Sequence, residues 1–228
     1  MSEIVKPIAV FDLDGTLADT AADLMTALNT LLAKEDLPPL PLEKAKELIG
    51  AGARALIERG FNSSGVSISD DRLETLFREF IGIYGAHLHD ETVLFPGVPE
   101  ALDQLREDGI LLAVCTNKYE DQSIKLLEWL GIGNRFAFIA GRDTFPFHKP
   151  DPRHLTETIV KAGGDLRNAV MVGDSNTDIR TAREAGIPVI GVPFGYTDKP
   201  IAELQPNLVV EHYRDMPDAV RSLLRKGA

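Results

Sequence analysis

A short apolar run leads directly into two carboxylates near the start of the chain. The residues from Ile8 to Phe11 are all apolar, and Asp12 and Asp14 follow with one residue between them. Such a run predicts a buried strand of a parallel sheet, because these strands are covered on both faces. At the end of an extended strand, Asp12 and Asp14 would point to the same side. Two carboxylates held so close repel each other, and one pKa rises unless a cation lies beside them.

Three kinds of chemistry would account for this pair. Carboxylate oxygens bind a divalent cation such as magnesium. One carboxylate could attack phosphorus and form an aspartyl-phosphate, and the other could carry a proton. The alternative is a polar loop in which Asp12 or Asp14 only caps the next helix. An isolated Asp-x-Asp pattern leaves both interpretations open.

Strand and helix patterns alternate through most of the remaining chain. Further strands are predicted at residues 110–115, 136–140, 170–172, 189–192 and, as a short one, 208–210. This alternation predicts an α/β fold, a parallel sheet with helices on both faces.

Residues 18–91 interrupt this alternation, because they show helix and loop patterns but no strand pattern. Helices are expected there at about 20–34, 42–49, 51–60 and 73–89. Thr20 and Asp23 have the spacing of a capping box at the start of the first of these helices. We therefore expect a core formed by residues 1–17 and 92–228, with an inserted all-helical cap at 18–91.

Polar motifs follow the predicted strands at their carboxyl ends, where ligands bind in sheets of this kind. These motifs lie in three loops far apart in the sequence: Asp12 with Asp14, Thr116 with Asn117, and Asp174. The Thr116–Asn117 turn suits a phosphate but also an ordinary helix cap. Lys118 follows and could add positive charge at the rim of a site.

Two further groups could complete such a site. Asp178 lies one helical turn after Asp174, so both would face the same way and suit magnesium. The alternative is helix capping by Asp174 or Ser175. Lys149 lies in a loop stiffened by neighbouring prolines, where its ammonium could neutralise a phosphoryl oxygen. A lone lysine is otherwise usually solvated surface.

Composition limits the partners and the compartment. Asp and Glu number 35 against 24 Lys and Arg, and this net charge of −11 repels nucleic acid and anionic membranes. A single cysteine, Cys115, excludes an internal disulfide and a cysteine metal cluster. The first residues lack the apolar segment of a signal peptide, and no apolar run approaches the ~18 residues that span a bilayer. We expect a soluble, cytoplasmic protein.

The stretch Phe11-Asp12-Leu13-Asp14-Gly15-Thr16-Leu17 resembles the first motif of the haloacid dehalogenase-like phosphatase superfamily. Thr116, Lys149 and Asp174 with Asp178 match its other motifs, over nearly the whole chain. The resemblance implies a Rossmann-like core and a helical cap inserted after the first motif. It also implies phosphoryl transfer, because the dehalogenases of the superfamily lack an acid at the position of Asp14.

The same resemblance implies a role for each motif residue. Asp12 would be the nucleophile, and Asp14 would be the general acid and then the general base. Thr116, Asn117 and Lys149 would bind the transferred phosphoryl group.

The resemblance also implies Mg²⁺ as the cofactor. The side chains of Asp12 and Asp174 and the main-chain carbonyl of Asp14 would hold it. Asp178 would support that metal site or orient Lys149. The other supporting residues would be Gly173 and Ser175.

Several stretches resemble bacterial phosphoglycolate phosphatases in particular. They are Gly50-Ala51-Gly52-Ala53-Arg54, Thr116-Asn117-Lys118, Asp143-Thr144-Phe145-Pro146 before Lys149-Pro150, and Phe194-Gly195-Tyr196. This implies hydrolysis of 2-phosphoglycolate to glycolate and phosphate. Arg54, in a cap loop that could reach over the site, could bind the substrate carboxylate with two hydrogen bonds. The alternative for Arg54 is a solvated residue at a helix start.

Other functions on the same scaffold stay open. A sugar-phosphate mutase similar to β-phosphoglucomutase would keep Asp12 and Asp14 but shield the aspartyl-phosphate from water. A pyrophosphatase, a nucleotide phosphatase and a non-catalytic binding module are further alternatives. We expect a small anionic phosphate ester as the ligand, no nucleic-acid or membrane partner, and a monomer or homodimer.

Overall fold

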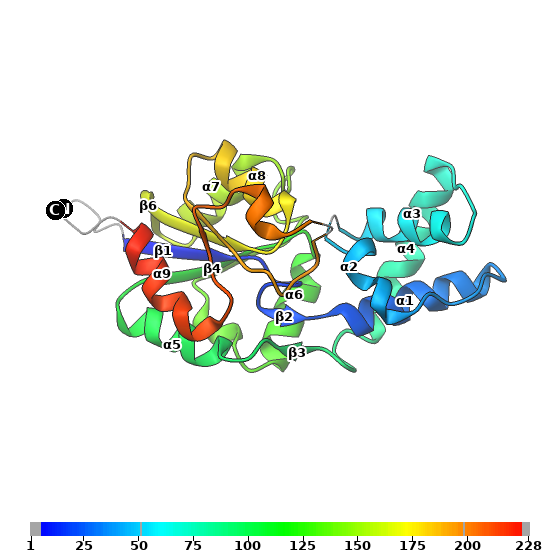
Figure 1. Cartoon of the computed structure of the whole chain (residues 1–228), viewed down its shortest axis with the longest axis horizontal. Coiled ribbons are helices and arrows are strands. Elements are labelled where there is room, and N and C mark those ends of the chain that lie inside the picture. Colours follow the sequence, from blue (N-terminus) through cyan, green and yellow to red (C-terminus); the bar gives the residue numbers. More distant parts are fainter. Residues whose placement is uncertain (1–5, 51, 198, 225–228) are drawn as a thin grey trace.

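The computed structural model describes residues 6–50, 52–197 and 199–224. Among them, six strands form one parallel sheet in the order β5-β4-β1-β6-β7-β8 (Figure 1). Their bounds are β1 Lys6–Phe11, β4 Leu111–Cys115, β5 Phe138–Ala140, β6 Gly164–Gly173, β7 Val189–Gly191 and β8 Leu208–Val209. The predicted α/β fold is confirmed. After β1 the chain builds the sheet first on one side of β1 and later on the other, so β1 lies at the switch point where ligands bind in such sheets.

Helices cover both faces of this sheet, and β1 contributes to both apolar layers. Ala9 and Phe11 pack into one layer and Ile8 and Val10 into the other, because successive strand residues point to opposite faces. The helices of the first layer are α5 (Val98–Glu107), α6 (Glu120–Trp129) and α9 (Met216–Leu223); those of the second are α7 (Pro152–Lys161) and α8 (Asn176–Glu184). Figure 1 shows α5 and α9 below the sheet and α7 and α8 above it.

A group of helices lies beyond one end of the sheet (Figure 1). These helices are α1 (Ala21–Lys34), α2 (Ala45–Leu48), α3 (Ala53–Ser63) and α4 (Asp70–Ala86). α4 packs against α1 and α3, with Leu28, Phe61 and Phe80 buried between them. In the described part of the chain, no helix combines the length and apolar character needed to cross a bilayer. The exact division into core and cap stays a prediction.

Two short strands connect the group of helices α1–α4, called the cap from here on, to the sheet and its covering helices, called the core. β2 (Ala18–Asp19) pairs antiparallel with β3 (Val93–Leu94). The prediction that residues 18–91 contain only helix and loop was therefore wrong at Ala18 and Asp19. A two-residue strand is too short to show an alternating pattern, and only its pairing identifies it.

Asp23 joins the two crossing segments of the chain, which are the start of α1 after β2 and residues 91–92 before β3. Its buried carboxylate accepts the N–H groups of Glu91 and Thr92, each at 3.0 Å, and the Thr92 hydroxyl at 2.6 Å. The Thr20 side chain makes no capping hydrogen bond to α1. The predicted capping box was wrong, because the Asp23 carboxylate has its partners 68 and 69 residues further along the chain.

Some element boundaries also differ from the predicted ones. β6 begins at Gly164 rather than at residue 170, because the first half of the strand is polar and carries no apolar run. α4 begins at Asp70 rather than at residue 73, since the Ser69 hydroxyl accepts the Arg72 N–H at 3.3 Å and caps the helix.

Replacing Asp23 by Ala should lower the free energy of unfolding by roughly 2–4 kcal/mol, because several buried donors lose their acceptor. Urea denaturation measures this change. Asp121→Ala is the control, because Asp121 is exposed on α6 and pairs with Lys125 one helical turn away, so its replacement should leave stability nearly unchanged. Equally small effects of both substitutions would show that Asp23 does not hold the crossing segments.

Candidate functional site

The carboxyl ends of three adjacent strands bring the predicted motif residues together. Asp12 follows β1, Thr116 follows β4 and Asp174 follows β6. All three line one cavity between the core and the cap, with an empty volume of about 740 Å³ including its open part. The other predicted residues on its wall are Asp14, Asn117, Lys118, Lys149 and Ser175.

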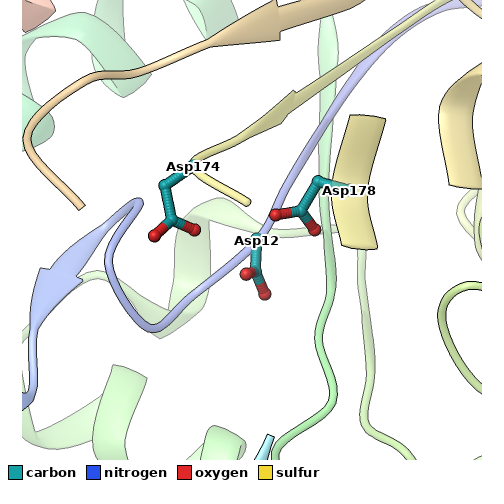
Figure 2. A group of neighbouring side chains, drawn as sticks. All are labelled: Asp12, Asp174 and Asp178. Carbon is teal, nitrogen blue, oxygen red and sulfur yellow. The ribbon is translucent and has the colours of Figure 1, made fainter. Parts of the chain in front are cut away.

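Three buried aspartates face one another beside this cavity (Figure 2). One oxygen each of Asp12, Asp174 and Asp178 lies within 4.8 Å of the others. Burial raises the pKa of Asp12 to about 6. Burial and the charge of Asp178 raise the pKa of Asp174 well above its usual value. The cluster therefore favours any positive charge placed beside it.

Lys149 supplies part of that charge. Its Nζ lies 2.8 Å from Asp12 Oδ1 and 2.6 Å from Asp178 Oδ1. Burial would lower the pKa of Lys149, but the attraction of these two carboxylates outweighs it and raises the pKa. The main-chain N–H of Lys149 donates to His154 Nδ1 at 3.1 Å, and its main-chain oxygen accepts from Asn117 Nδ2 at 2.9 Å. Asn117 therefore positions Lys149 in addition to lining the cavity.

Asp178 already has both carboxylate oxygens engaged. Oδ1 accepts from Lys149, while Oδ2 accepts the main-chain N–H of Ser175 at 3.1 Å and its hydroxyl at 2.6 Å. Gly173 permits this close approach, because a Cβ there would lie 2.4 Å from Asp178 Cγ. Asp178 thus holds Lys149 and Ser175 and is not on the cavity wall formed by the described residues, whereas Asp12 and Asp174 are.

Asp174 is held by residues to which sequence reasoning assigned no role. Its Oδ2 accepts the main-chain N–H of Tyr196 at 2.5 Å, and its Oδ1 accepts the Thr16 hydroxyl at 3.3 Å. A Cβ on Gly195 would lie 2.3 Å from Asp174 Oδ2, so this approach needs glycine. Gly195 and Tyr196 stood out in the sequence only through the resemblance, since no spacing rule connects them with Asp174.

Lys118 lies deeper than the rim position that the sequence predicted. Its buried ammonium donates to both oxygens of Asp14, at 2.8 and 3.1 Å, and to the Tyr84 hydroxyl at 2.7 Å. Tyr84 belongs to α4, so the cap contacts the Asp14 carboxylate through Lys118. Sequence reasoning missed Tyr84, because an aromatic residue on an amphipathic helix indicates core packing.

Arg54 is absent from the cavity wall formed by the described residues. Its guanidinium pairs with Glu74 and lies 4.3 Å from the centroid of the Phe77 ring. In this arrangement Arg54 already has a carboxylate partner in Glu74, and its expected contact with a substrate carboxylate stays a prediction. Arg142, which sequence reasoning did not select, lines the cavity instead.

Known proteins are similar in sequence to this chain over most or all of its length. Residues 9–192 match a family model described as haloacid dehalogenase-like hydrolase. The chain is 46% identical over its full length to a phosphoglycolate phosphatase of Agrobacterium fabrum and covers 98% of that protein. It is 48% identical to a phosphoglycolate phosphatase of Mesorhizobium japonicum, over 91% of this chain and 92% of that one.

Solved structures share the architecture as well. The crystal structure of a predicted phosphoglycolate phosphatase from Haemophilus somnus has a TM-score of 0.85 at 30% identity, and the match covers 94% of this chain and 97% of that chain. The family model and the relatives together cover the motif residues, the sheet and the cap. This chain therefore belongs to the haloacid dehalogenase-like hydrolase family and is one of its phosphatases.

Proposed function

We propose that this phosphatase hydrolyses a small phosphate monoester, 2-phosphoglycolate, with Mg²⁺ and through an aspartyl-phosphate. The observation that carries the proposal is the convergence of Asp12, Lys149 and Asp174 on one cavity. The relatives named phosphoglycolate phosphatase, at 46% and 48% identity, support the choice of substrate. The cytoplasmic location and the monomeric or homodimeric state stay predictions from the sequence.

In this proposal Asp12 is the nucleophile and Asp14 the acid and base. A carboxylate oxygen of Asp12 attacks phosphorus, the bond from phosphorus to the ester oxygen breaks, and Asp14 gives that oxygen a proton. Asp14 then takes a proton from the water that attacks the aspartyl-phosphate, which releases phosphate and restores Asp12. Lys118 holds both oxygens of Asp14, at 2.8 and 3.1 Å, and so fixes the orientation of this carboxylate.

Lys149, Thr116 and Asn117 are proposed to bind the transferred phosphoryl group. The Lys149 ammonium lies 2.8 Å from Asp12, so it would also lie beside the oxygens of a phosphoryl group joined to that carboxylate. A charge in a buried site acts more strongly than one in water. The Thr116 hydroxyl oxygen accepts the Lys118 N–H at 3.3 Å, which leaves the hydroxyl proton to donate to phosphate.

The residues present fit Mg²⁺. Four carboxylates and two ammonium groups meet at the site: Asp12, Asp14, Asp174 and Asp178, with Lys118 and Lys149. The two negative charges left over match a divalent cation. Asp12, Asp174 and the main-chain carbonyl of Asp14 would hold the ion, since magnesium takes few carboxylates and hard oxygen ligands. When bound, it would neutralise charge on the phosphoryl oxygens.

The cap encloses the site on its other side. Its apolar residues Leu56, Phe77 and Phe80 line the cavity. This wall would keep water from the first step, and a movement of the cap would admit the water that the second step needs.

The first test measures phosphate release from a panel of esters with Mg²⁺ and with a chelator. We expect Mg²⁺-dependent turnover of 2-phosphoglycolate well above that of pyrophosphate, nucleoside monophosphates and β-glucose 1-phosphate. Asp12→Asn should lower kcat by about 10³-fold or more, because it removes the nucleophile. Asp121→Asn on exposed α6 is the control and should keep full activity. Conversion of β-glucose 1-phosphate to an isomer without phosphate release would identify a mutase instead.

A second test addresses the metal without measuring turnover. Asp174→Asn should raise the stability of the metal-free protein by about 1–2 kcal/mol, because it removes a charge from a cluster that repels it. The amide oxygen can still accept the Tyr196 N–H. Thermal unfolding should show a rise in Tm with Mg²⁺ for the wild type and none for the variant. If Mg²⁺ does not change the Tm of the wild type, this result would contradict the proposed metal site.

A further inference from the structure

Among the described residues of the cavity wall, Arg142 is the cation that has no carboxylate partner. Within the described residues, three cationic side chains line the cavity: Lys118, Arg142 and Lys149. Lys118 is paired with Asp14, and Lys149 with Asp12. Arg142 has no carboxylate partner in the described part of the chain. In a protein with a net charge of −11, a guanidinium left unpaired in the cavity would attract an anion.

The backbone places Arg142 beside the proposed phosphate-binding loop. Arg142 follows β5, the neighbour of β4, and its N–H donates to the main-chain oxygen of Lys118 at 2.9 Å. The preceding Gly141 packs so closely against the start of α6 that a Cβ would lie 2.2 Å from Glu120 N. The oxygen of Gly141 lies 3.1 Å from His154 Nε2. The base of Arg142 is therefore fixed on the core, and only its side chain extends into the cavity.

Two aromatic rings lie close to the Arg142 guanidinium. Its Cζ is 5.6 Å from the centroid of Phe77 and 5.8 Å from that of Tyr119. Phe77 belongs to α4 of the cap and Tyr119 to the core, so the guanidinium lies where the two parts meet. Apolar rings exclude water and so strengthen the attraction between a cation and an anion. Burial and the charge of Arg142 lower the pKa of the neighbouring His148.

We propose that Arg142 forms the subsite for a carboxylate group of the substrate, while the phosphoryl group lies against Asp12 and Lys149. This inference rests on the proposed function and adds the residue that selects the other end of the substrate. A guanidinium binds a carboxylate through two parallel hydrogen bonds. A substrate without that group leaves the guanidinium unpaired, which penalises its binding. Arg54 is less suited, because it pairs with Glu74 and is not on the cavity wall formed by the described residues.

The test compares 2-phosphoglycolate with ethyl phosphate, in which a methyl group replaces the carboxylate. Arg142→Gln should lower kcat/KM for 2-phosphoglycolate about 10- to 100-fold, mainly through KM, the loss expected for a hydrogen-bonded ion pair. The same variant should leave kcat/KM for ethyl phosphate nearly unchanged. Arg142→Lys should recover part of the loss, because a point charge remains. An equal loss for both substrates would overturn the inference.

Arg54→Gln is the matched control, because it removes the other guanidinium that contacts the Phe77 ring. The ratio of the two kcat/KM values should then stay near that of the wild type. A loss of preference in Arg54→Gln but not in Arg142→Gln would place the carboxylate subsite on the cap and refute the role of Arg142.

An unreactive analogue separates this inference from the proposed function. In 3-phosphonopropionate a methylene replaces the ester oxygen, so calorimetry can measure its binding with Mg²⁺ present. Arg142→Gln should weaken that binding about 10-fold or more, with an unchanged Tm. A wild type without preference for 2-phosphoglycolate over ethyl phosphate would contradict the proposed function. A wild-type preference that Arg142→Gln retains would contradict only the role of Arg142.

Discussion

Lys149 lies between two buried aspartates, and the other groups of the site are arranged around that contact. Asp12 and Asp178 would repel each other out of water, and the ammonium at 2.8 and 2.6 Å offsets the repulsion. Asn117 and His154 hold the Lys149 backbone from two sides. The ends of β1 and β4 and the start of α8 must therefore keep their relative positions, because a shift in any of them would unpair a buried charge.

Two tyrosines connect the cap and strand β2 to other charged groups of the site. Tyr84 of α4 accepts a hydrogen bond from Lys118, which in turn holds the proposed acid and base. Tyr196 donates its N–H to Asp174 and its hydroxyl to Asp19 in strand β2, the latter at 2.6 Å. A movement of the cap would thus alter the surroundings of both carboxylates. This coupling gives a physical reason for a cap that encloses the site, beyond the exclusion of water.

A site residue could be predicted from the sequence where a pattern in the neighbouring residues marks its position in the fold. Asp12, Thr116 and Asp174 each follow an apolar run, and parallel strands bring their carboxyl ends to one edge of the sheet. Their meeting could therefore be inferred before any coordinates. Tyr84 and Arg142 carried no such signal, because one lies in an ordinary amphipathic pattern and the other in a polar loop. Their positions on the cavity depend on how α4 and the loop after β5 pack against the core.

The order of strands and helices, the burial of β1 and the polar side chains at strand ends were determined by the sequence itself, because periodicity and composition act over short segments. Only the tertiary structure decided which partner each charged side chain has. Arg54 pairs with Glu74, Asp23 binds the segment at Thr92 rather than capping α1, and Lys118 reaches Asp14 beneath the cap. Each contact joins residues at least twenty positions apart. A long or ionised side chain takes the partner that packing brings within reach, and a local pattern contains no information about that partner.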